Sequence, residues 1–534
     1  MYKKNTRIIV LNIIITLLIL GLLIRLFYIQ YIKGETYAKI AVQQKIESLN
    51  LEKRRGEIYD RNLIPFVDRT SSEYIYAIPG MIVNKKTASI ILNKITGISD
   101  LEIYKDLNSE KDIIKYKCKY TYKGNLPIGL FKMDIPQRYD SNSLARHVIG
   151  YYGIISYGLE NTFNKTLSSN GIESVAVFKD NYNDYLKGLG VKIINSQNKV
   201  FSIEITLDYH IQKAVEDILD KNIINGAAVV LDVKNGDILA MASRPNYDQN
   251  KVSSYIDSKN EELLNKALIE YPPGSIFKII VASAALENKK VNIYDNFVDE
   301  PYINIDGVIY HNFMDESNGL INMDKAFEVS SNTTFIKIGQ KTGGSNIIDM
   351  AKKFGITKDD NLPVEEQVGT LPLLKNTYGA GIGNLSIGQG DVTMTPLQAA
   401  DIAATIANDG IRNVPNLLKA IVDENGTVVE NLHKTNSYRV ISESTALSVK
   451  KMMRDVVANG TGKNAETEYK SAGKTGSAEV SREKNIYHAW FTGFVPYDKP
   501  VYAISVFVKN GDIGGIKAAP IFKEIANEIM KYYK

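Results

Sequence analysis

The sequence predicts an α+β protein, in which a large C-terminal domain with an antiparallel sheet flanked by helices follows a smaller N-terminal domain. Three observations support this prediction. The 534 residues exceed one ordinary domain, so two or three globular units are expected. A long apolar run lies close to the N-terminus, and helix-like and strand-like segments alternate from about residue 205 onward.

Composition narrows the class of protein. Hydrophobic residues make up 44% and charged residues 23%, as is usual for folded domains. The net charge of +4 is close to neutral for this length, so nucleic acid is not expected as a partner. The single cysteine, Cys118, excludes an intrachain disulfide, and the five histidines show no spacing of metal ligands, so we expect no metal or other cofactor.

The N-terminal segment is expected to anchor the chain in a membrane. Basic residues within positions 1–7 precede an apolar run over 8–32 that only Arg25 interrupts. At about 1.5 Å per residue in a helix, this run can cross a bilayer core of about 30 Å. The basic flank predicts a cytoplasmic tail at 1–7 and an extracytoplasmic location for everything after residue 32. The alternative is a cleaved signal peptide, which the lack of a small-x-small cleavage site after the run disfavours.

Residues 33–204 are expected to form an N-terminal domain that carries no catalytic cluster. The segment 33–49 is typical of a helix that leaves the membrane, and 54–62 of a strand that runs into a polar turn. Neither internal repeats nor a Pro- or Ser-rich linker is found.

Residues 205–534 are expected to form one large domain. Ile211, Val215 and Ile218 share one face of a helix over 207–219. Two apolar runs around Asn235-Gly236 then predict a hairpin. Near the end of the chain, 487–496 and 501–511 are predicted to be neighbouring strands, and 519–533 a closing helix.

One serine stands out from a common motif. Ser-x-x-Lys occurs five times, at Ser196, Ser275, Ser448, Ser471 and Ser481, so the spacing alone has no weight. Only Ser275 follows a rigid Pro-Pro-Gly turn and opens a long apolar helix, whose N-terminus favours negative charge. One helical turn would set the Lys278 amine beside the Ser275 hydroxyl, where it could remove the proton. The alternative is an ordinary serine N-cap.

Two further motifs follow Ser275. Ser330-Ser331-Asn332 supplies a hydroxyl and an amide at the head of another helix, although serine and asparagine are also favoured N-caps. Lys474-Thr475-Gly476-Ser477 has small residues on both sides, as an edge strand needs when a peptide must lie against its backbone. A second Lys-Thr-Gly at 341–343 is better explained as the end of a helix.

Ser-x-x-Lys, Ser-x-Asn and Lys-Thr-Gly in this order form a known combination, and the chain resembles the penicillin-binding proteins. Segments such as "NKALIEYPPGSIFKI", "GKTGSAE" and "AWFTGFVP" carry the resemblance over most of 205–530. "RRGEIYDRN" and "RHVIGYYGIISYGLENTF" resemble the pedestal of the class B, monofunctional members. The resemblance implies the penicillin-binding transpeptidase or serine β-lactamase-like fold for 205–534, on an elongated, dimerisation-type pedestal at 33–204.

The resemblance implies a D,D-transpeptidase that cross-links peptidoglycan stem peptides. Ser275 would attack the carbonyl between the last two D-alanines, and Lys278, kept neutral by a nearby cation, would accept the proton. Lys474 would be that cation. Ser330 would bridge the two lysines and relay a proton to the leaving D-alanine, while Asn332 would hold a peptide amide of the substrate.

The resemblance also implies the binding residues. Lys474, Thr475, Gly476 and Ser477 would bind the donor peptide, with the Thr475 and Ser477 hydroxyls on its carboxylate. The backbone amides of Ser275 and Ser477 would form an oxyanion hole. Ser477 replaces the commoner threonine and keeps its hydroxyl. A β-lactam would acylate Ser275 and remain bound.

Other functions and partners stay open at this stage. A D,D-carboxypeptidase or a β-lactamase would pass the acyl group to water on the same fold, and a β-lactam sensor or scaffold would not turn over. Class B members work with a polytopic SEDS-family glycosyltransferase, so such a partner is expected. The sequence does not distinguish a role in elongation, division or sporulation.

Overall fold

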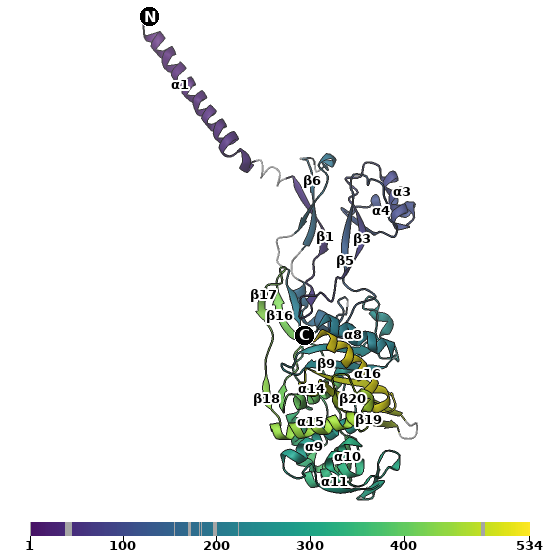
Figure 1. Ribbon diagram of the computed structural model, residues 1–534. Helices are drawn as coiled ribbons and strands as arrows, with labels where there is room; N and C mark the ends of the chain where they lie inside the picture. The colour runs from purple at the N-terminus through teal and green to yellow at the C-terminus, as the bar shows by residue number, and fades with distance from the viewer. Residues whose placement is uncertain are drawn as a thin grey trace. The chain divides into compact units, whose positions relative to one another are not determined.

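Figure 1 shows the computed structural model of the chain. The structure describes residues 2–37, 45–153, 155–168, 172–180, 182, 184–195, 200–222, 224–481 and 486–533. Two compact units divide the chain, and each consists of several segments. The first contains Met1–Arg54, Ser71–Pro136 and Asn170–Asn198, and the second contains Arg55–Thr70, Gln137–Ser169 and Lys199–Lys534.

The first unit begins with an exposed apolar helix. Helix α1 (Tyr2–Phe27) continues into a π-helical turn, η1 (Tyr28–Ile32). Within Asn5–Ile32 an 18-residue stretch has a mean hydropathy of 2.7, and none of that stretch is buried inside the described structure. By length and composition this helix could cross a membrane, and it contains the expected span at 8–32.

Two small sheets make up the rest of the first unit. One has the order β1-β6-β7, from β1 (Ile46–Lys53), β6 (Ile172–Phe178) and β7 (Lys192–Asn195). The other has the order β4-β3-β5, from β3 (Thr70–Ala77), β4 (Ile114–Lys117) and β5 (Leu130–Gln137). Helices α3 (Lys85–Thr96) and α4 (Asp100–Leu107) share a core with the second sheet. A short turn, η2 (Lys187–Leu189), precedes β7.

The expected helix over 33–49 is wrong at its C-terminal end. Residues 38–44 lie outside the described part of the chain, and Ile46–Lys53 form strand β1 instead of a helix. The reason is tertiary: Leu49 pairs with Val175 of β6, and both side chains are buried in one apolar cluster.

The second unit is organised around a five-stranded sheet of order β10-β9-β21-β20-β19, in which all neighbours are antiparallel. Its strands are β9 (Gly226–Asp232), β10 (Ile238–Arg244), β19 (Ala472–Ser481), β20 (Ile486–Val495) and β21 (Tyr502–Val508). The expected hairpin around Asn235-Gly236 and the expected strand pair near the C-terminus are confirmed. Strand β19 occupies one edge of the sheet, as its small residues predict.

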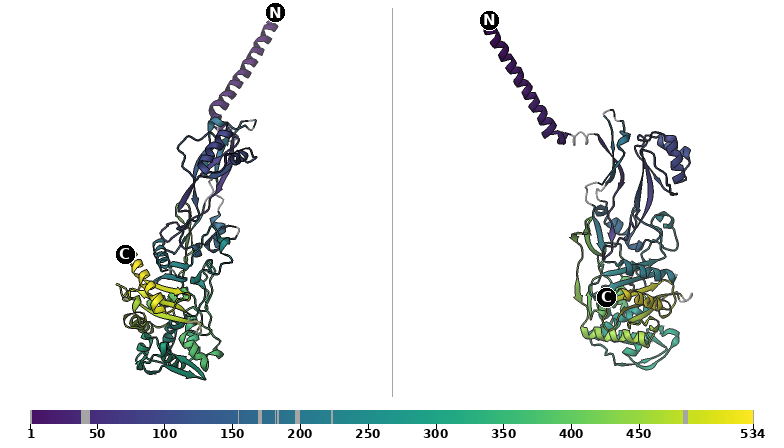
Figure 2. Two further views of the ribbon diagram at one scale, coloured as in Figure 1. Left: turned by 90° about the vertical axis from the view of Figure 1, so that its right-hand side faces the viewer. Right: turned by 45° about the horizontal axis from the view of Figure 1, so that its top comes forward.

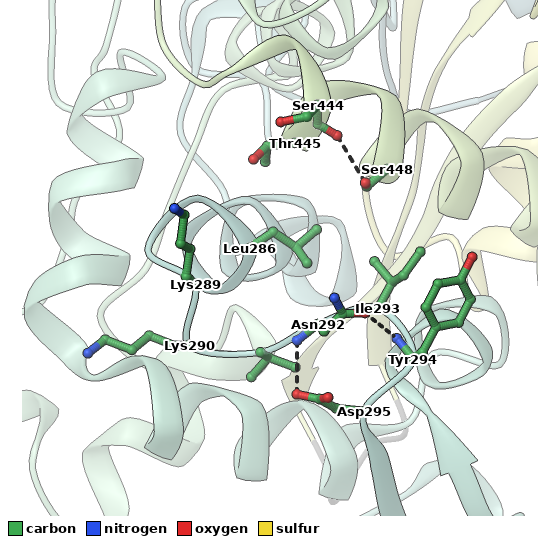
Figure 3. A pocket seen from close by; sticks show the side chains of 11 residues that line it. Leu286, Lys289, Lys290, Asn292, Ile293, Tyr294, Asp295, Ser444, Thr445 and Ser448 are labelled. Carbon is green, nitrogen blue, oxygen red and sulfur yellow. Dashed lines mark hydrogen bonds between the residues drawn. The ribbon is translucent and has the colours of Figure 1, made fainter.

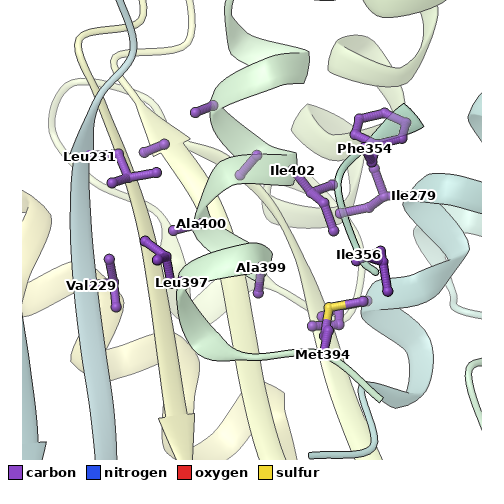
Figure 4. Packing of buried hydrophobic residues seen from close by; sticks show 14 of the residues in the cluster. Val229, Leu231, Ile279, Phe354, Ile356, Met394, Leu397, Ala399, Ala400 and Ile402 are labelled. Atoms are coloured by element: carbon purple, nitrogen blue, oxygen red, sulfur yellow. The ribbon is translucent and has the colours of Figure 1, made fainter. Parts of the chain in front are cut away.

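Helices cover both faces of this sheet. Helix α8 (Tyr209–Lys221), capped by Asp208, and α16 (Gly514–Ile529) share one core with the side chains of one face. In Figures 1 and 2 the yellow α16 lies along the sheet. Helix α14 (Pro396–Ala407) packs on the other face, where Figure 4 shows Leu397 beside Val229 and Leu231. The closing helix begins at Gly514 and ends at Ile529, five residues earlier than expected at its start, with Pro520 inside it.

The remaining elements of the second unit complete the packing around this sheet. They are β2 (Ile58–Tyr59), α5 (Arg146–Ile149), α6 (Gly158–Thr162), α7 (Asn164–Leu167), β8 (Ser202–Ile205), η3 (Val252–Tyr255), η4 (Lys266–Leu268), η5 (Gly274–Phe277), α9 (Lys278–Glu287), β11 (Asn296–Asp299), β12 (Tyr302–Ile305), β13 (Val308–His311), η6 (Phe313–Asp315), β14 (Gly319–Asn322), α10 (Met323–Glu328), α11 (Asn332–Thr342), α12 (Gly344–Lys353), η7 (Leu374–Thr377), α13 (Ala380–Ile387), β15 (Ile411–Asn413), β16 (Leu418–Val422), β17 (Val428–Asn431), β18 (Ser437–Arg439), α15 (Glu443–Ala458), η8 (Lys463–Ala465) and η9 (Met530–Tyr532).

The two compact units do not follow the expected single boundary between residues 204 and 205. Segments 55–70 and 137–169 group with the C-terminal part of the chain. Several of their apolar side chains, among them Ile58 and Leu159, are buried in its main core, and β2 pairs in parallel with β8. Core packing therefore assigns these segments to the second unit.

A buried carboxylate ties these segments together. Glu160 of α6 accepts two hydrogen bonds from Arg55, at 2.8 and 2.6 Å, and one from Arg138 at 2.7 Å. The Tyr139 hydroxyl donates to the same carboxylate at 2.9 Å. The side chain of Glu160 is inaccessible to solvent and pairs with both guanidinium groups, and Arg138 pairs in addition with Asp68 at 2.6 Å.

We expect Glu160→Ala to lower the free energy of unfolding by about 3 kcal/mol, because it leaves two largely buried arginines without this counter-ion. Thermal or chemical denaturation of the detergent-solubilised protein measures the effect. Glu430→Ala, at an exposed position of β17, is the matched control and should change stability by less than about 0.5 kcal/mol. An equal effect of the two variants would contradict the prediction.

Candidate active site

The Pro-Pro-Gly-Ser segment forms a tight turn against the edge strand. Ser275 lies half-buried in η5, a turn that directly precedes α9, and Lys278 is the first residue of α9. Gly274 has φ 56°. A Cβ at Gly274 would lie 3.0 Å from the Ser477 carbonyl oxygen of β19, so only glycine fits without displacement. The Trp490 indole donates a hydrogen bond to the Pro272 carbonyl at 3.0 Å and fixes the other side of the turn.

The turn is also closed from the side of α13. Gly274 donates its N–H to the Gly388 carbonyl at 2.9 Å. A Cβ at Gly388 would lie 2.2 Å from the Gly274 carbonyl oxygen, and one at Gly476 would lie 2.8 Å from the Pro273 carbonyl oxygen. Backbone atoms of the Ser275 turn therefore lie close to backbone atoms of neighbouring segments on both sides.

The Lys278 amine points toward the Ser-x-Asn loop. Its Nζ donates to the Ser330 carbonyl at 2.7 Å, to Asn332 Oδ1 at 2.8 Å and to the Ser331 carbonyl at 3.3 Å. Within the described residues no hydrogen bond joins Lys278 to the Ser275 hydroxyl, although the two residues share one turn. The hydrogen bonds of the Lys278 amine therefore go to the Ser-x-Asn loop, and its expected contact with the Ser275 hydroxyl stays a prediction.

The hydroxyl of Ser330 lies between two lysines. Lys474 Nζ donates to Ser330 Oγ at 2.9 Å, and Lys278 Nζ lies 3.4 Å from the same oxygen. Ser330 has φ 61°, an uncommon conformation for a residue with a side chain, so the loop holds this hydroxyl in a strained backbone. Ser331 then caps α11, and Asn332 is its first residue.

The Lys-Thr-Gly segment lies in β19. Lys474 is inaccessible to solvent and pairs with Thr492 of β20. Because β19 is the last strand of the sheet, its other edge is not paired with a strand of this sheet. The Thr475 hydroxyl shares a hydrogen bond of 2.7 Å with the Thr461 hydroxyl. Ser477 Oγ accepts one from the Gly514 N–H at 3.1 Å. The structure therefore brings all three motifs to one place.

Burial controls the protonation of both lysines. Burial and the nearby Lys474 charge hold the pKa of Lys278 well below its usual range, against an opposing effect of Asp299. Burial lowers the pKa of Lys474 to about 7. Two amines that share one hydroxyl in a dry site do not both carry a proton readily. The geometry favours neutral Lys278 and leaves the charge on Lys474.

Residues that sequence analysis did not find complete this site. Asp299, at the end of β11, and Asn312 support the Ser-x-Asn loop from behind, and Thr461 and Gly514 contact the Lys-Thr-Gly strand. Each lies in a segment without a motif. Only their proximity in the folded chain identifies them.

A separate cavity opens at the C-terminal end of α9. It has a volume of about 560 Å³ and is lined by the loop at 289–295, by Leu286 and by the first turns of α15 (Figure 3). None of the site residues expected from the sequence lines it. The cavity is therefore distinct from the cluster around Ser275.

A serine that opens a helix beside two buried lysines, on a helix-flanked antiparallel sheet, is typical of enzymes that transfer acyl groups through serine. The comparisons with known proteins agree with this class. The chain belongs to the penicillin-binding protein transpeptidase family, because the model for the "Penicillin binding protein transpeptidase domain" matches residues 226–527, more than half of its 534 residues. The expectation of a class B penicillin-binding protein is confirmed by its relatives.

Three of the curated proteins to which this chain is similar are compared with it by their identity and by the share of each chain that is covered. "Stage V sporulation protein D" of Bacillus subtilis is 28% identical over 94% of this chain and 82% of its own length. "Peptidoglycan D,D-transpeptidase MrdA" of Haemophilus influenzae is 27% identical over 97% of this chain and 90% of its own. "Peptidoglycan D,D-transpeptidase PbpA" of Mycobacterium tuberculosis is 32% identical over 61% of this chain and 71% of its own.

Solved structures confirm the expected fold. An imipenem acyl-enzyme complex of penicillin-binding protein A from M. tuberculosis has a TM-score of 0.64 at 25% identity, and covers 75% of this chain and 93% of that one. A chain from a peptidoglycan synthase complex has a TM-score of 0.72 at 24% identity, and 97% of each chain is covered. The helix and sheet arrangement described above is that of the family.

Proposed function

We propose that this chain cross-links peptidoglycan as a D,D-transpeptidase, with Ser275 as the nucleophile. The observation that carries the assignment is the Ser330 hydroxyl between two solvent-inaccessible lysines, one of them on the turn of Ser275. A buried amine with a depressed pKa is the base that a serine needs near neutral pH. Relatives named as D,D-transpeptidases support the reaction class.

In the acylation step, Ser275 Oγ attacks the carbonyl carbon of the bond between the two terminal D-alanines of a stem peptide. Its proton passes to Lys278 Nζ, which is neutral because of burial and the Lys474 charge. The backbone N–H groups of Ser275 and Ser477 would stabilise the developing oxyanion. The close approach of the Ser275 turn to β19, where a Cβ at Gly274 would lie 3.0 Å from the Ser477 carbonyl oxygen, supports this assignment. The C–N bond then breaks, and the proton returns through the Ser330 hydroxyl to the leaving D-alanine amine.

In the transfer step, an amine from a second stem peptide attacks the acyl-enzyme carbonyl and regenerates the Ser275 hydroxyl. Before acylation, Lys474 and the hydroxyls of Thr475 and Ser477 bind the donor carboxylate, which later leaves with the terminal D-alanine, and Gly476 allows the peptide to lie against β19. Asn332 holds a substrate amide. A β-lactam forms the same acyl-enzyme, but its leaving group stays tethered and no cross-link follows.

We further propose that α1 anchors the chain with residues 1–7 in the cytoplasm and the transpeptidase outside. The basic residues ahead of the span support this orientation. A SEDS-family glycosyltransferase is the proposed membrane partner. The likeness of fold to a chain taken from a peptidoglycan synthase complex is consistent with it.

The test is to incubate the detergent-solubilised protein with a labelled penicillin and, separately, with synthetic stem pentapeptides. We expect a stable one-to-one adduct by intact-mass spectrometry, and a cross-linked peptide product with released D-alanine. Release of D-alanine without a cross-link would show a carboxypeptidase instead. Rapid turnover of penicillin would show a β-lactamase, and an adduct with no peptide chemistry would show a sensor.

The two lysines also predict a bell-shaped pH dependence of acylation by a carboxylate-bearing β-lactam. The rate should rise with pH as Lys278 loses its proton, and fall above about pH 7 as Lys474 loses the charge that binds the carboxylate. Stopped-flow measurement of the second-order acylation rate gives both limbs. Lys474→Arg keeps its charge to high pH and should move the alkaline limb upward by more than about 2 units. An unchanged alkaline limb in that variant would assign it to another group.

A further inference from the structure

A buried carboxylate lies behind the Ser-x-Asn loop. Asp299 ends β11 and is only 1% exposed. Its Oδ1 accepts hydrogen bonds from Ser331 Oγ at 2.5 Å, from Thr333 Oγ1 at 2.8 Å and from Asn312 Nδ2 at 2.9 Å. Its Oδ2 accepts two more from Asn318, at 2.7 and 3.0 Å. The Thr334 hydroxyl donates a longer hydrogen bond to Oδ1 at 3.4 Å. An ionised carboxylate only accepts, so six donors converge on a charge held in the interior.

Asn312 transmits this arrangement to the residues of the site. While its Nδ2 donates to Asp299, its Oδ1 accepts from the Asn332 N–H at 2.7 Å and from the Thr333 N–H at 3.1 Å. Asn332, whose side chain accepts a hydrogen bond from Lys278, is thus bonded directly to Asn312, and Ser331, which follows Ser330, is bonded directly to Asp299.

We propose that Asp299 is a positioning residue of the acylation reaction, which fixes the Ser-x-Asn loop around the Lys278 amine and biases the charge of that amine. The proposal rests on the function proposed above. Asp299 does not contact the substrate. It acts through Ser331 and Asn312, whose neighbours Ser330 and Asn332 accept the hydrogen bonds of Lys278.

Two charged groups act on Lys278, the positive Lys474 of β19 and the negative Asp299. In the described part of the chain, its amine also contacts the neutral Ser330, Ser331 and Asn332, and the ring of Phe335 lies 5.4 Å from its Nζ. Asp299 favours the ammonium form, so its removal should leave Lys278 neutral at lower pH.

The carboxylate therefore has two separable effects. As an acceptor it sets the geometry of the loop, and displacement of a reacting group by about 1 Å can cost about 100-fold in rate. As a charge it sets the pH at which the base becomes neutral. A residue with a purely structural role would not move the pH dependence.

The experiment compares three full-length variants with the wild type, by the second-order rate of acylation with penicillin across about pH 5 to pH 10. Asp299→Asn should lower the plateau rate at least about tenfold and move the acid limb to lower pH. Thr333→Val removes one hydrogen bond that Asp299 accepts but keeps the carboxylate charge. It should therefore lower the plateau rate of acylation several-fold and leave the acid limb of the pH profile unchanged. Glu300→Gln, the matched charge change at an exposed neighbour paired with Lys337, should match the wild type.

Far-UV circular dichroism and thermal melting establish that each variant is folded. A folded Asp299→Asn that reacts at the wild-type rate with the wild-type acid limb overturns the proposal. If Asp299→Asn does not fold, Thr333→Val decides, and a wild-type plateau in that variant overturns the positioning role. A wild-type protein that forms no adduct refutes the proposed function itself, which is a distinct result from a reactive wild type with unaffected variants.

Discussion

Ser275→Ala is expected to abolish the covalent adduct with labelled penicillin and all peptide cross-linking. The hydroxyl is the only atom of residue 275 that can form the acyl bond, and the two lysines behind it cannot replace it while they are buried. Because the side chain is small and half-buried in a turn held by backbone contacts, its loss should leave the fold intact. Gel fluorescence after labelling, with thermal melting as the folding check, measures the outcome.

The chain itself offers the control for this prediction. Ser448 also precedes a lysine by three residues, but its hydroxyl donates to the Ser444 carbonyl within α15 at 2.9 Å. Ser448→Ala should therefore label like the wild type. Labelling that survives in Ser275→Ala, or that disappears in Ser448→Ala, would assign the nucleophile elsewhere.

Lys278→Met is expected to move activity and stability in opposite directions. Loss of a general base typically costs about 100-fold to 10,000-fold in rate, so acylation should nearly disappear. The same change removes a solvent-inaccessible amine that no carboxylate among the described residues contacts directly, and a methionine of similar length fills its volume. The melting temperature should therefore be unchanged or higher.

Acylation kinetics and calorimetry on the same preparation check both parts. Lys290→Met, on the exposed loop after α9, is the matched control and should alter neither measurement. A Lys278→Met protein that melts well below the wild type would show that the amine stabilises the fold, and near-normal acylation would remove it from the proton path.

Much of the second unit could be predicted because its patterns are local. Asn235-Gly236 predicts the hairpin of β9 and β10, the apolar spacing over 207–219 predicts α8, and the small residues around Lys474 predict an edge strand, all as found. Strand β1 could not be predicted, because its state depends on pairing with β6, more than 100 positions along the chain. The start of α16 was also missed, since Gly514 and Pro520 are poor helix formers that tertiary packing retains.

The three motifs of the site were visible in the sequence, whereas their supports were not. Ser275, Ser330 and Lys474 occur in patterns with a recognisable order. Asp299 stands in "NFVDEPY", where nothing distinguishes it from a surface carboxylate until the chain folds. Its importance depends on six donors that come from three other segments of the chain.

The close contacts around the nucleophile's turn limit how this protein can evolve under antibiotic pressure. At Gly274, Gly388 and Gly476 a single added carbon would strike backbone atoms, which cannot rotate aside. Stepwise selection cannot reshape that turn against a drug without first losing the enzyme. Resistant descendants should therefore carry their substitutions on the side chains that surround the turn, and these three glycines should remain unchanged in every surviving lineage.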